Sequence, residues 1–307
     1  MKPFYISLKP FLDYRQLTRP TDWTQIFNNS KPLEVEIGFG NGEYLARLAA
    51  RADTNFVGFE EYCERIHKTL RKLSRVSNDN VRVLRMDVRP AFDYLFAPRS
   101  ISYIHCLYPP PWPKKSDAKH RLFTTAFLQL ANNRLVEGGT LKIVTDFHPY
   151  IEWIKEQLPG AGFAMDLKTI AASYDTKFER KWFDGGQREF YEMILIKEQH
   201  QEIVPKKEAV LKQYLLEKFN PRQFKLTPYS QDGIAVVFKD LLFDEVRQTA
   251  MIHLLVNDEH IFQNIRVVVY ATPKGWKINL AEGTMQMPTA GITKALDLVY
   301  DAAQATA

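Results

Sequence analysis

The chain has 307 residues, a length that predicts about two domains, each able to bury its own core. Hydrophobic residues make up 45% of it and charged residues 25%, which excludes an intrinsically disordered chain. The net charge of +5 fits a polyanionic partner but is also ordinary for an enzyme.

No apolar run approaches the roughly 18 residues of a membrane-spanning helix, and Lys9, Pro10 and Asp13 interrupt the start of the chain. We therefore expect a cytoplasmic protein that has no membrane partner. Cys63 and Cys106 are too few for a disulfide framework and lack the spacing of a zinc site. We expect both to be reduced thiols, and we expect no metal.

From residue 33 to about 196, short apolar runs alternate with longer helical patterns. This order is typical of βαβ units around a mostly parallel sheet. Strands are expected at 33–37, 56–59, 81–85, 101–107, 141–144 and 191–196. Helices are expected at 44–49, 63–75, 124–135 and 150–157. We predict a doubly wound α/β fold.

A second unit is expected after a polar, charged stretch at 199–207 that Pro205 interrupts, so we place the domains at 1–203 and 204–307. Leu211, Leu215 and Phe219 recur every four residues and indicate a helix. Strands at 234–238, 251–256, 265–270 and 276–280 and a helix at 293–302 complete a smaller α+β domain. It holds 12 basic and 11 acidic residues, so the positive excess lies mostly in residues 1–203.

The turn after the first strand, Gly38-Phe39-Gly40-Asn41-Gly42, carries glycines at alternate positions, which let backbone pass close to a ligand. A dinucleotide fingerprint would read GxGxxG instead. Glu36 precedes the turn, and a carboxylate there suits a cationic ligand better than a diphosphate. The pattern favours S-adenosylmethionine over NAD.

Two further acids end the next two predicted strands. Glu60 lies 20 residues beyond Gly40, where an acidic side chain can accept hydrogen bonds from both ribose hydroxyls. Asp87 has the same place after the third strand, where a carboxylate could meet the adenine amino group. Each residue by itself would be an ordinary polar strand end, but three such acids beside a glycine-rich turn favour a cofactor site.

The segment after the fourth predicted strand, Tyr-Pro-Pro-Pro-Trp-Pro-Lys-Lys, is stiff enough to aim Trp112. The basic residues there suit phosphate contacts, although a stiff loop with a solvated charge run remains an alternative. They are Lys114, Lys115, Lys119 and Arg121. Farther on, Glu179 could accept from the N1 and N2 donors of guanine while Lys177 reaches a phosphate.

The segments EIGFGNG, NFVGFE, PWPKK, TDFHPYIEW and TKFERKW, in this order, resemble the bacterial tRNA (guanine-N7)-methyltransferase family over about residues 33–197. The resemblance implies a class I, Rossmann-like methyltransferase fold, S-adenosylmethionine as donor, and methylation of a guanosine in the variable loop of tRNA. It implies cofactor-binding positions at Glu36, Gly38, Gly40, Glu60, Asp87 and Pro110. It implies substrate-binding positions at Lys114, Asp146, Thr176, Lys177, Phe178 and Glu179. The oligomeric state, monomer or homodimer, stays open.

The chain departs from this family at one important position. The family's motif is Pro-Asp-Pro-Trp, with the aspartate as its proposed catalytic residue, and this chain has Pro110 there. Ser116, Asp117 and His120 also depart, so the predicted RNA-contacting surface is weaker. N7 of guanine has a lone pair and no proton, so methyl transfer needs no general base, although a carboxylate would stabilise the developing positive charge.

We therefore expect a methyltransferase of reduced activity, in which Asp146 and Glu179 are the remaining acids that could supply this charge. Two alternatives remain open. The chain could be a catalytically impaired relative that binds RNA or a protein partner, or a methyltransferase that acts on another nucleic-acid target.

Overall fold

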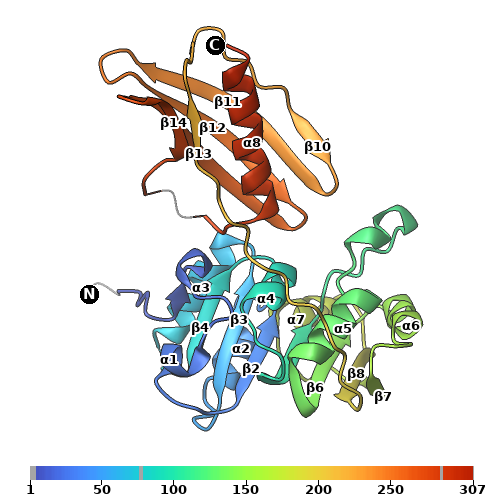
Figure 1. Cartoon of the computed structure of the whole chain (residues 1–307). Coiled ribbons are helices and arrows are strands. Elements are labelled where there is room, and N and C mark those ends of the chain that lie inside the picture. Colours follow the sequence, from blue (N-terminus) through green and yellow to red (C-terminus); the bar gives the residue numbers. More distant parts are fainter. Residues whose placement is uncertain (1–4, 76–78, 284–285, 307) are drawn as a thin grey trace. The chain divides into compact units, whose positions relative to one another are not determined.

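The computed structural model describes residues 5–75, 79–283 and 286–306. The chain divides into two compact units, Met1–Pro205 and Lys206–Ala307, and each is described by itself (Figure 1). We call them unit 1 and unit 2.

The described part of unit 1 contains an 8-stranded sheet in the order β1-β4-β3-β2-β5-β6-β8-β7. Its strands are β1 (Phe11–Leu12), β2 (Leu33–Ile37), β3 (Asn55–Glu60), β4 (Val81–Arg85), β5 (Ile101–Leu107), β6 (Leu135–Thr145), β7 (Phe163–Ile170) and β8 (Phe190–Lys197). Pairing is parallel from β1 to β6, and β8 is antiparallel to both its neighbours. The order reverses between β2 and β5, the kind of switch point outside which such sheets bind ligands.

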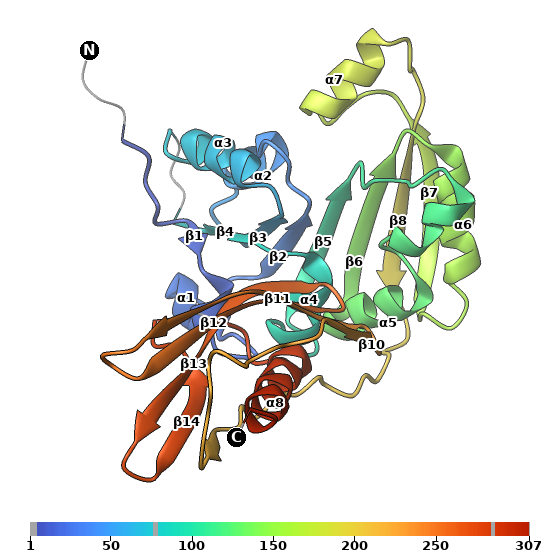
Figure 2. The same ribbon diagram turned by 90° about the horizontal axis from the view of Figure 1, so that it is seen from above.

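Helices cover both faces of this sheet (Figure 2). The helical segments are η1 (Tyr14–Gln16), α1 (Trp23–Phe27), α2 (Glu43–Leu48), α3 (Cys63–Leu73), α4 (Val88–Tyr94), η2 (Lys115–His120), α5 (Thr125–Arg134), α6 (His148–Gln157) and α7 (Lys177–Asp184). Figure 2 shows α2 and α3 on one face and α5 and α6 on the other. Every residue of β2 and β3 is buried, as expected of strands covered on both faces. The predicted doubly wound, Rossmann-like fold is confirmed.

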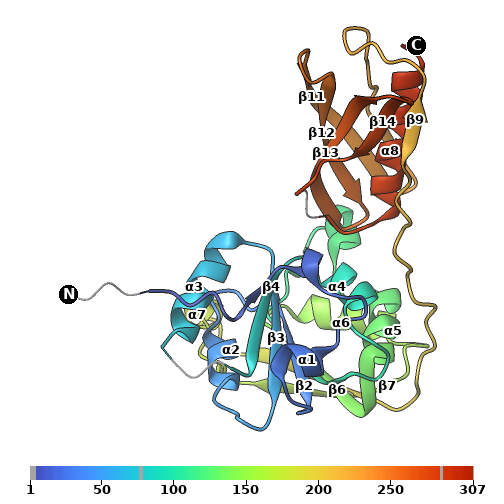
Figure 3. The same cartoon turned by 60° about the vertical axis from the view of Figure 1, so that its left-hand side comes forward.

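The described part of unit 2 is an antiparallel sheet of 6 strands in the order β10-β11-β12-β13-β14-β9, with α8 (Ala290–Gln304) packed on it (Figure 3). The strands are β9 (Tyr214–Leu216), β10 (Tyr229–Gln231), β11 (Ile234–Asp244), β12 (Thr249–Asp258), β13 (Ile261–Thr272) and β14 (Gly275–Leu280). Alternate strand residues such as Ile252, Leu254 and Val267 are buried with Ile292 and Leu296 of α8. The predicted α+β class is therefore confirmed.

The helix predicted from Leu211, Leu215 and Phe219 is wrong, because the structure has the strand β9 in that segment. Leu216 pairs with Trp276 at the edge of β14, and Tyr214 stacks on Tyr300 with ring centroids 4.7 Å apart. An unpaired strand edge offers backbone donors and acceptors that must find partners. Pairing with that edge outweighs the helical spacing of the apolar residues.

Candidate active site

The glycine-rich turn between β2 and α2 has positive φ angles at Gly38, Gly40 and Gly42. A Cβ at Gly42 would lie 2.5 Å from the Thr69 side chain of α3, so this glycine is required by packing. A Cβ at Gly38 would meet no atom within 4 Å. Gly38 therefore borders open space at the sheet's switch point, where a ligand can approach the backbone.

Glu36, on β2, is only 3% exposed, and its Oε2 atom has no hydrogen-bond partner among the described residues. Burial raises the pKa of Glu36 to about 8, although the nearby Arg47 and Lys142 act in the opposite direction. Burying a polar atom without a partner is unfavourable. A cation bound here would supply the missing partner.

Glu60, at the end of β3, holds the glycine-rich turn in place. Its Oε2 accepts from the Gly40 N–H at 3.0 Å, and its Oε1 accepts from the N–H groups of Glu61 and Tyr62. The Arg65 guanidinium lies 3.2 Å from the same carboxylate. A ribose bound to Glu60 would share the carboxylate with these donors.

Asp87 caps α4 directly after β4. Its carboxylate accepts from the Arg89 N–H at 2.7 Å and from the Arg89 guanidinium at 2.8 Å. Arg89 also donates to the His120 carbonyl at 3.0 Å, which ties α4 to the end of η2. Because β4, β3 and β2 are neighbours and parallel, the sheet brings Glu36, Glu60 and Asp87 to one edge, as the sequence predicted.

The proline-rich loop after β5 is held from inside by Arg121. This side chain is only 9% exposed and donates to the carbonyls of Pro111 and Trp112 at 3.0 and 3.1 Å. Its guanidinium also lies 5.0 Å from the Trp153 ring centroid. These contacts favour a structural role for Arg121 over the phosphate contact predicted from the sequence. Pro110 is exposed, as are three lysines in and after the loop, Lys114, Lys115 and Lys119.

Thr176 and Glu179 cap and anchor the start of α7. The Thr176 hydroxyl accepts from the Glu179 N–H at 3.2 Å. Glu179 is 1% exposed, and its Oε1 accepts from the Tyr108 hydroxyl at 2.8 Å and from the N–H groups of Ser173 and Tyr174. Sequence reasoning missed Tyr108, although its place directly after a predicted strand was a usable signal. Burial and the bond to Glu179 raise the Tyr108 pKa, so this hydroxyl stays a donor.

The first turn of α7 lies beside the glycine-rich turn. The Phe178 ring lies 3.9 Å from where a Cβ of Gly40 would stand, and 5.7 Å from the Arg65 guanidinium. Lys177 is exposed. Asp146 follows β6, and burial raises its pKa. The fold thus brings the predicted guanosine-binding segment against the predicted cofactor turn.

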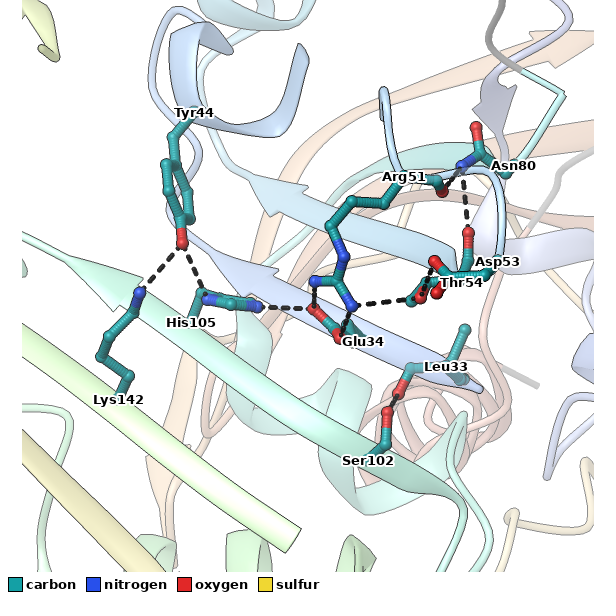
Figure 4. A network of polar contacts seen from close by, with 10 residues as sticks. All are labelled: Leu33, Glu34, Tyr44, Arg51, Asp53, Thr54, Asn80, Ser102, His105 and Lys142. Atoms are coloured by element: carbon teal, nitrogen blue, oxygen red, sulfur yellow. Dashed lines mark hydrogen bonds and ion pairs between the residues drawn. The ribbon is translucent and has the colours of Figure 1, made fainter. Parts of the chain in front are cut away.

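A polar network lies on the sheet face beside Glu36 and was not anticipated (Figure 4). Arg51 donates twice to Glu34, at 3.0 and 2.9 Å, and His105 donates to Glu34 at 2.8 Å. The Tyr44 hydroxyl lies 3.2 Å from His105 Nδ1 and accepts from Lys142 Nζ at 2.9 Å, so it links these two residues. The available signal was the presence of Glu, His and Lys inside strands that the sequence predicted for the sheet.

Among the described residues, no group of three or more His, Cys, Asp or Glu could hold a metal ion. Within the same part of the chain, no helix combines the length and the hydropathy needed to cross a membrane.

Comparison with known proteins finds methyltransferases. The family model described as "Putative methyltransferase" matches residues 30–192. A tRNA (guanine-N(7)-)-methyltransferase of Chlorobium phaeobacteroides is 38% identical over 180 residues, which cover 58% of this chain and 88% of that protein. The corresponding protein of Aquifex aeolicus is 25% identical over 298 residues, which cover 94% of this chain and 97% of that protein. The solved structure of the 16S rRNA methyltransferase KamB is 14% identical over 58% of this chain and 93% of that chain, with a TM-score of 0.47.

Proposed function

Because the chain belongs to the bacterial tRNA (guanine-N7)-methyltransferase family, we propose that it acts in the cytoplasm and transfers a methyl group from S-adenosylmethionine to N7 of a guanosine in the variable loop of tRNA. The observation that carries the proposal is the position of the Phe178 ring beside the turn at Gly40. It brings the candidate guanosine-binding segment next to the candidate cofactor turn, as transfer between two bound molecules requires.

The residues around the glycine-rich turn fit S-adenosylmethionine. The buried, unpartnered oxygen of Glu36 suits the ammonium of the methionine part, and the open space at Gly38 lets the cofactor reach the backbone. We assign the ribose to Glu60 and the adenine to Asp87, on the neighbouring strands β3 and β4. When bound, S-adenosylmethionine supplies an electrophilic sulfonium methyl group.

The chain's own residues would orient guanine rather than move a proton, because N7 attacks through a lone pair. We assign the guanine edge to Glu179, which Tyr108 and two backbone N–H groups hold through a single oxygen, Oε1. Asp146 directly follows β6 and contributes to raising the Tyr108 pKa. Asp146 and Glu179 are therefore our candidates for stabilising positive charge on the purine, since Pro110 supplies none.

The first experiment is incubation of the protein with unmodified tRNA and labelled S-adenosylmethionine, followed by digestion and identification of the methylated nucleoside. We expect 7-methylguanosine, formed slowly. Pro110→Asp should raise kcat by about 10²-fold, because a carboxylate there would face the developing charge. Pro110→Ala, which removes the ring without adding charge, is the matched control.

Each other outcome redirects the proposal. A different methylated nucleoside would change the substrate assignment. Product from Pro110→Asp alone would make the native chain an impaired relative that still binds RNA. If neither protein forms product nor binds S-adenosylmethionine, the proposed activity is wrong.

A further inference from the structure

Lys142 is a buried cation enclosed by tyrosines. It lies within β6 and is only 9% exposed. Its Nζ donates to the Tyr44 hydroxyl at 2.9 Å and lies 5.2, 5.8 and 4.8 Å from the ring centroids of Tyr44, Tyr103 and Tyr174. A buried ammonium is costly, and aromatic faces offset part of that cost. Replacing a buried charged residue by an apolar one often leaves protein stability unchanged or raises it. Stability alone therefore does not explain a lysine at this position.

The network of Figure 4 gives this ammonium a defined position. Because Lys142 donates to the Tyr44 oxygen, the Tyr44 O–H can donate to His105 Nδ1. His105 Nε2 then carries the proton that is donated to Glu34. Burial lowers the pKa of His105, which keeps the ring neutral in this arrangement. Lys142 is therefore held from the side of β2 and β5.

Tyr174 is the ring nearest to Lys142, and its remaining groups connect several elements. Its N–H donates to Glu179 Oε1 at 3.0 Å, and its carbonyl accepts from Arg47, directly before the last residue of α2. Its hydroxyl donates to Glu192 of β8. Its ring meets that of Tyr44 edge-on at 5.6 Å. Tyr174 thus joins the Glu179 carboxylate to the helix that follows the glycine-rich turn.

We propose that Lys142 and Tyr174 are positioning residues: the buried ammonium holds the Tyr174 ring, and Tyr174 holds the segment from Ser173 to Glu179 against the glycine-rich turn. The inference rests on the proposed function for the identity of the substrate that this segment binds, and it adds to that function the residues that position the segment. Neither residue is assigned a contact with substrate or cofactor. The acidic groups around Lys142 are Glu34, Glu36 and Glu192, so an effect through Glu36 on the cofactor is the competing explanation.

Lys142→Met removes the cation while keeping an unbranched side chain. We expect kcat/KM for tRNA to fall by up to about 10²-fold, because misplaced groups lose orientation, while the affinity for S-adenosylmethionine is unchanged. Lys142→Arg should restore most of the loss. Tyr174→Leu should have a similar effect, and the double variant should be no worse than either single variant, because both act through one contact.

Amide hydrogen exchange tests the positioning without catalysis. Peptides covering residues 171–184 should exchange faster in Lys142→Met and Tyr174→Leu than in the native protein, because the N–H bonds to Glu179 open more often. Lys168→Met, at an exposed lysine of β7 that pairs with Asp166, is the matched control and should change neither exchange nor kcat/KM.

Unchanged exchange and unchanged kcat/KM in Lys142→Met would overturn the proposal. A loss of S-adenosylmethionine affinity that matches the loss of kcat/KM would mean that Lys142 acts on the cofactor through Glu36. This result would also overturn the proposal. If the native protein forms no 7-methylguanosine, the proposed function fails, and the exchange experiment still decides whether Lys142 positions the segment.

Discussion

Glu34 and Glu36 are both buried on β2, and their partners put them in opposite ionisation states. Burial raises the pKa of Glu34, but the hydrogen bonds from His105 and Arg51 outweigh it and leave the pKa lowered. Glu36 has no such donors, and burial raises its pKa to about 8. At this scale the hydrogen-bond partners, rather than the residue type or its burial, decide which of the two carboxyl groups is ionised.

Glu36 should make stability depend on pH. Between the ordinary carboxyl range and about 8, the folded state binds a proton that the unfolded chain has released. The free energy of unfolding therefore falls as pH rises through this window, by at most about 1.4 kcal/mol per pH unit. Glu36→Gln removes this titration, so the variant should gain stability relative to the native protein as pH rises.

The check is urea unfolding of both proteins at several pH values across that window, following the transition of unit 1. Glu60→Gln is a useful contrast, because it removes an acceptor that the glycine-rich turn uses and should lower stability. The prediction would be contradicted if the free energy of unfolding changed with pH in the same way for Glu36→Gln and the native protein.

At the scale of elements, the loop after β5 and the segment η2 carry the basic residues that are candidates for RNA contacts. Lys115 and Lys119 are exposed on η2, whereas the buried Arg121 holds two loop carbonyls. We predict that Lys115→Ala and Lys119→Ala each reduce the slope of log affinity against log salt by about 1, through the loss of one phosphate contact.

Arg121→Met should leave that slope unchanged and instead lower kcat, because the loop loses the bonds at the Pro111 and Trp112 carbonyls. Tryptophan fluorescence with iodide quenching would report the change at Trp112. Arg121→Lys is the control, because lysine keeps the positive charge but lacks the planar guanidinium that donates to both loop carbonyls. A slope change in Arg121→Met equal to that of the lysine variants would instead return Arg121 to the phosphate-binding residues.

Several elements could not be predicted, for local reasons. The helix α4 is short and includes Pro90, and β7 alternates weakly because much of it is exposed. The Thr176-to-Glu179 pattern points to guanine recognition and also matches a helix-capping box. In the structure Thr176 does cap α7, but Glu179 turns to the N–H groups of Ser173 and Tyr174. The local sequence pattern is compatible with both roles of Glu179. The contacts with Ser173 and Tyr174 decide how its side chain is oriented.

At the scale of the whole molecule, each unit has its own hydrophobic core. We predict that fragments 1–205 and 206–307 fold separately, and that 1–205 binds S-adenosylmethionine, because the candidate cofactor residues all lie in unit 1. Circular dichroism should show cooperative thermal unfolding for each fragment. Calorimetry should show S-adenosylmethionine binding by 1–205.

A fragment that starts after Leu216 is the control for unit 2. It lacks β9, leaves the edge of β14 unpaired, and should unfold at lower temperature than 206–307. An unfolded 206–307 fragment would contradict the prediction, because its core would then depend on unit 1.

The sequence by itself determined the strands β2 to β6 and β8 of unit 1, the glycine-rich turn, and the three carboxylates at strand ends. It could do so because buried parallel strands are short apolar runs whose carboxyl ends share one edge of the sheet. The tertiary structure decided that Arg121 is buried, that β9 replaces a helix, and that Lys142 meets Tyr174. These features depend on contacts between residues far apart in the chain, which local spacing does not encode.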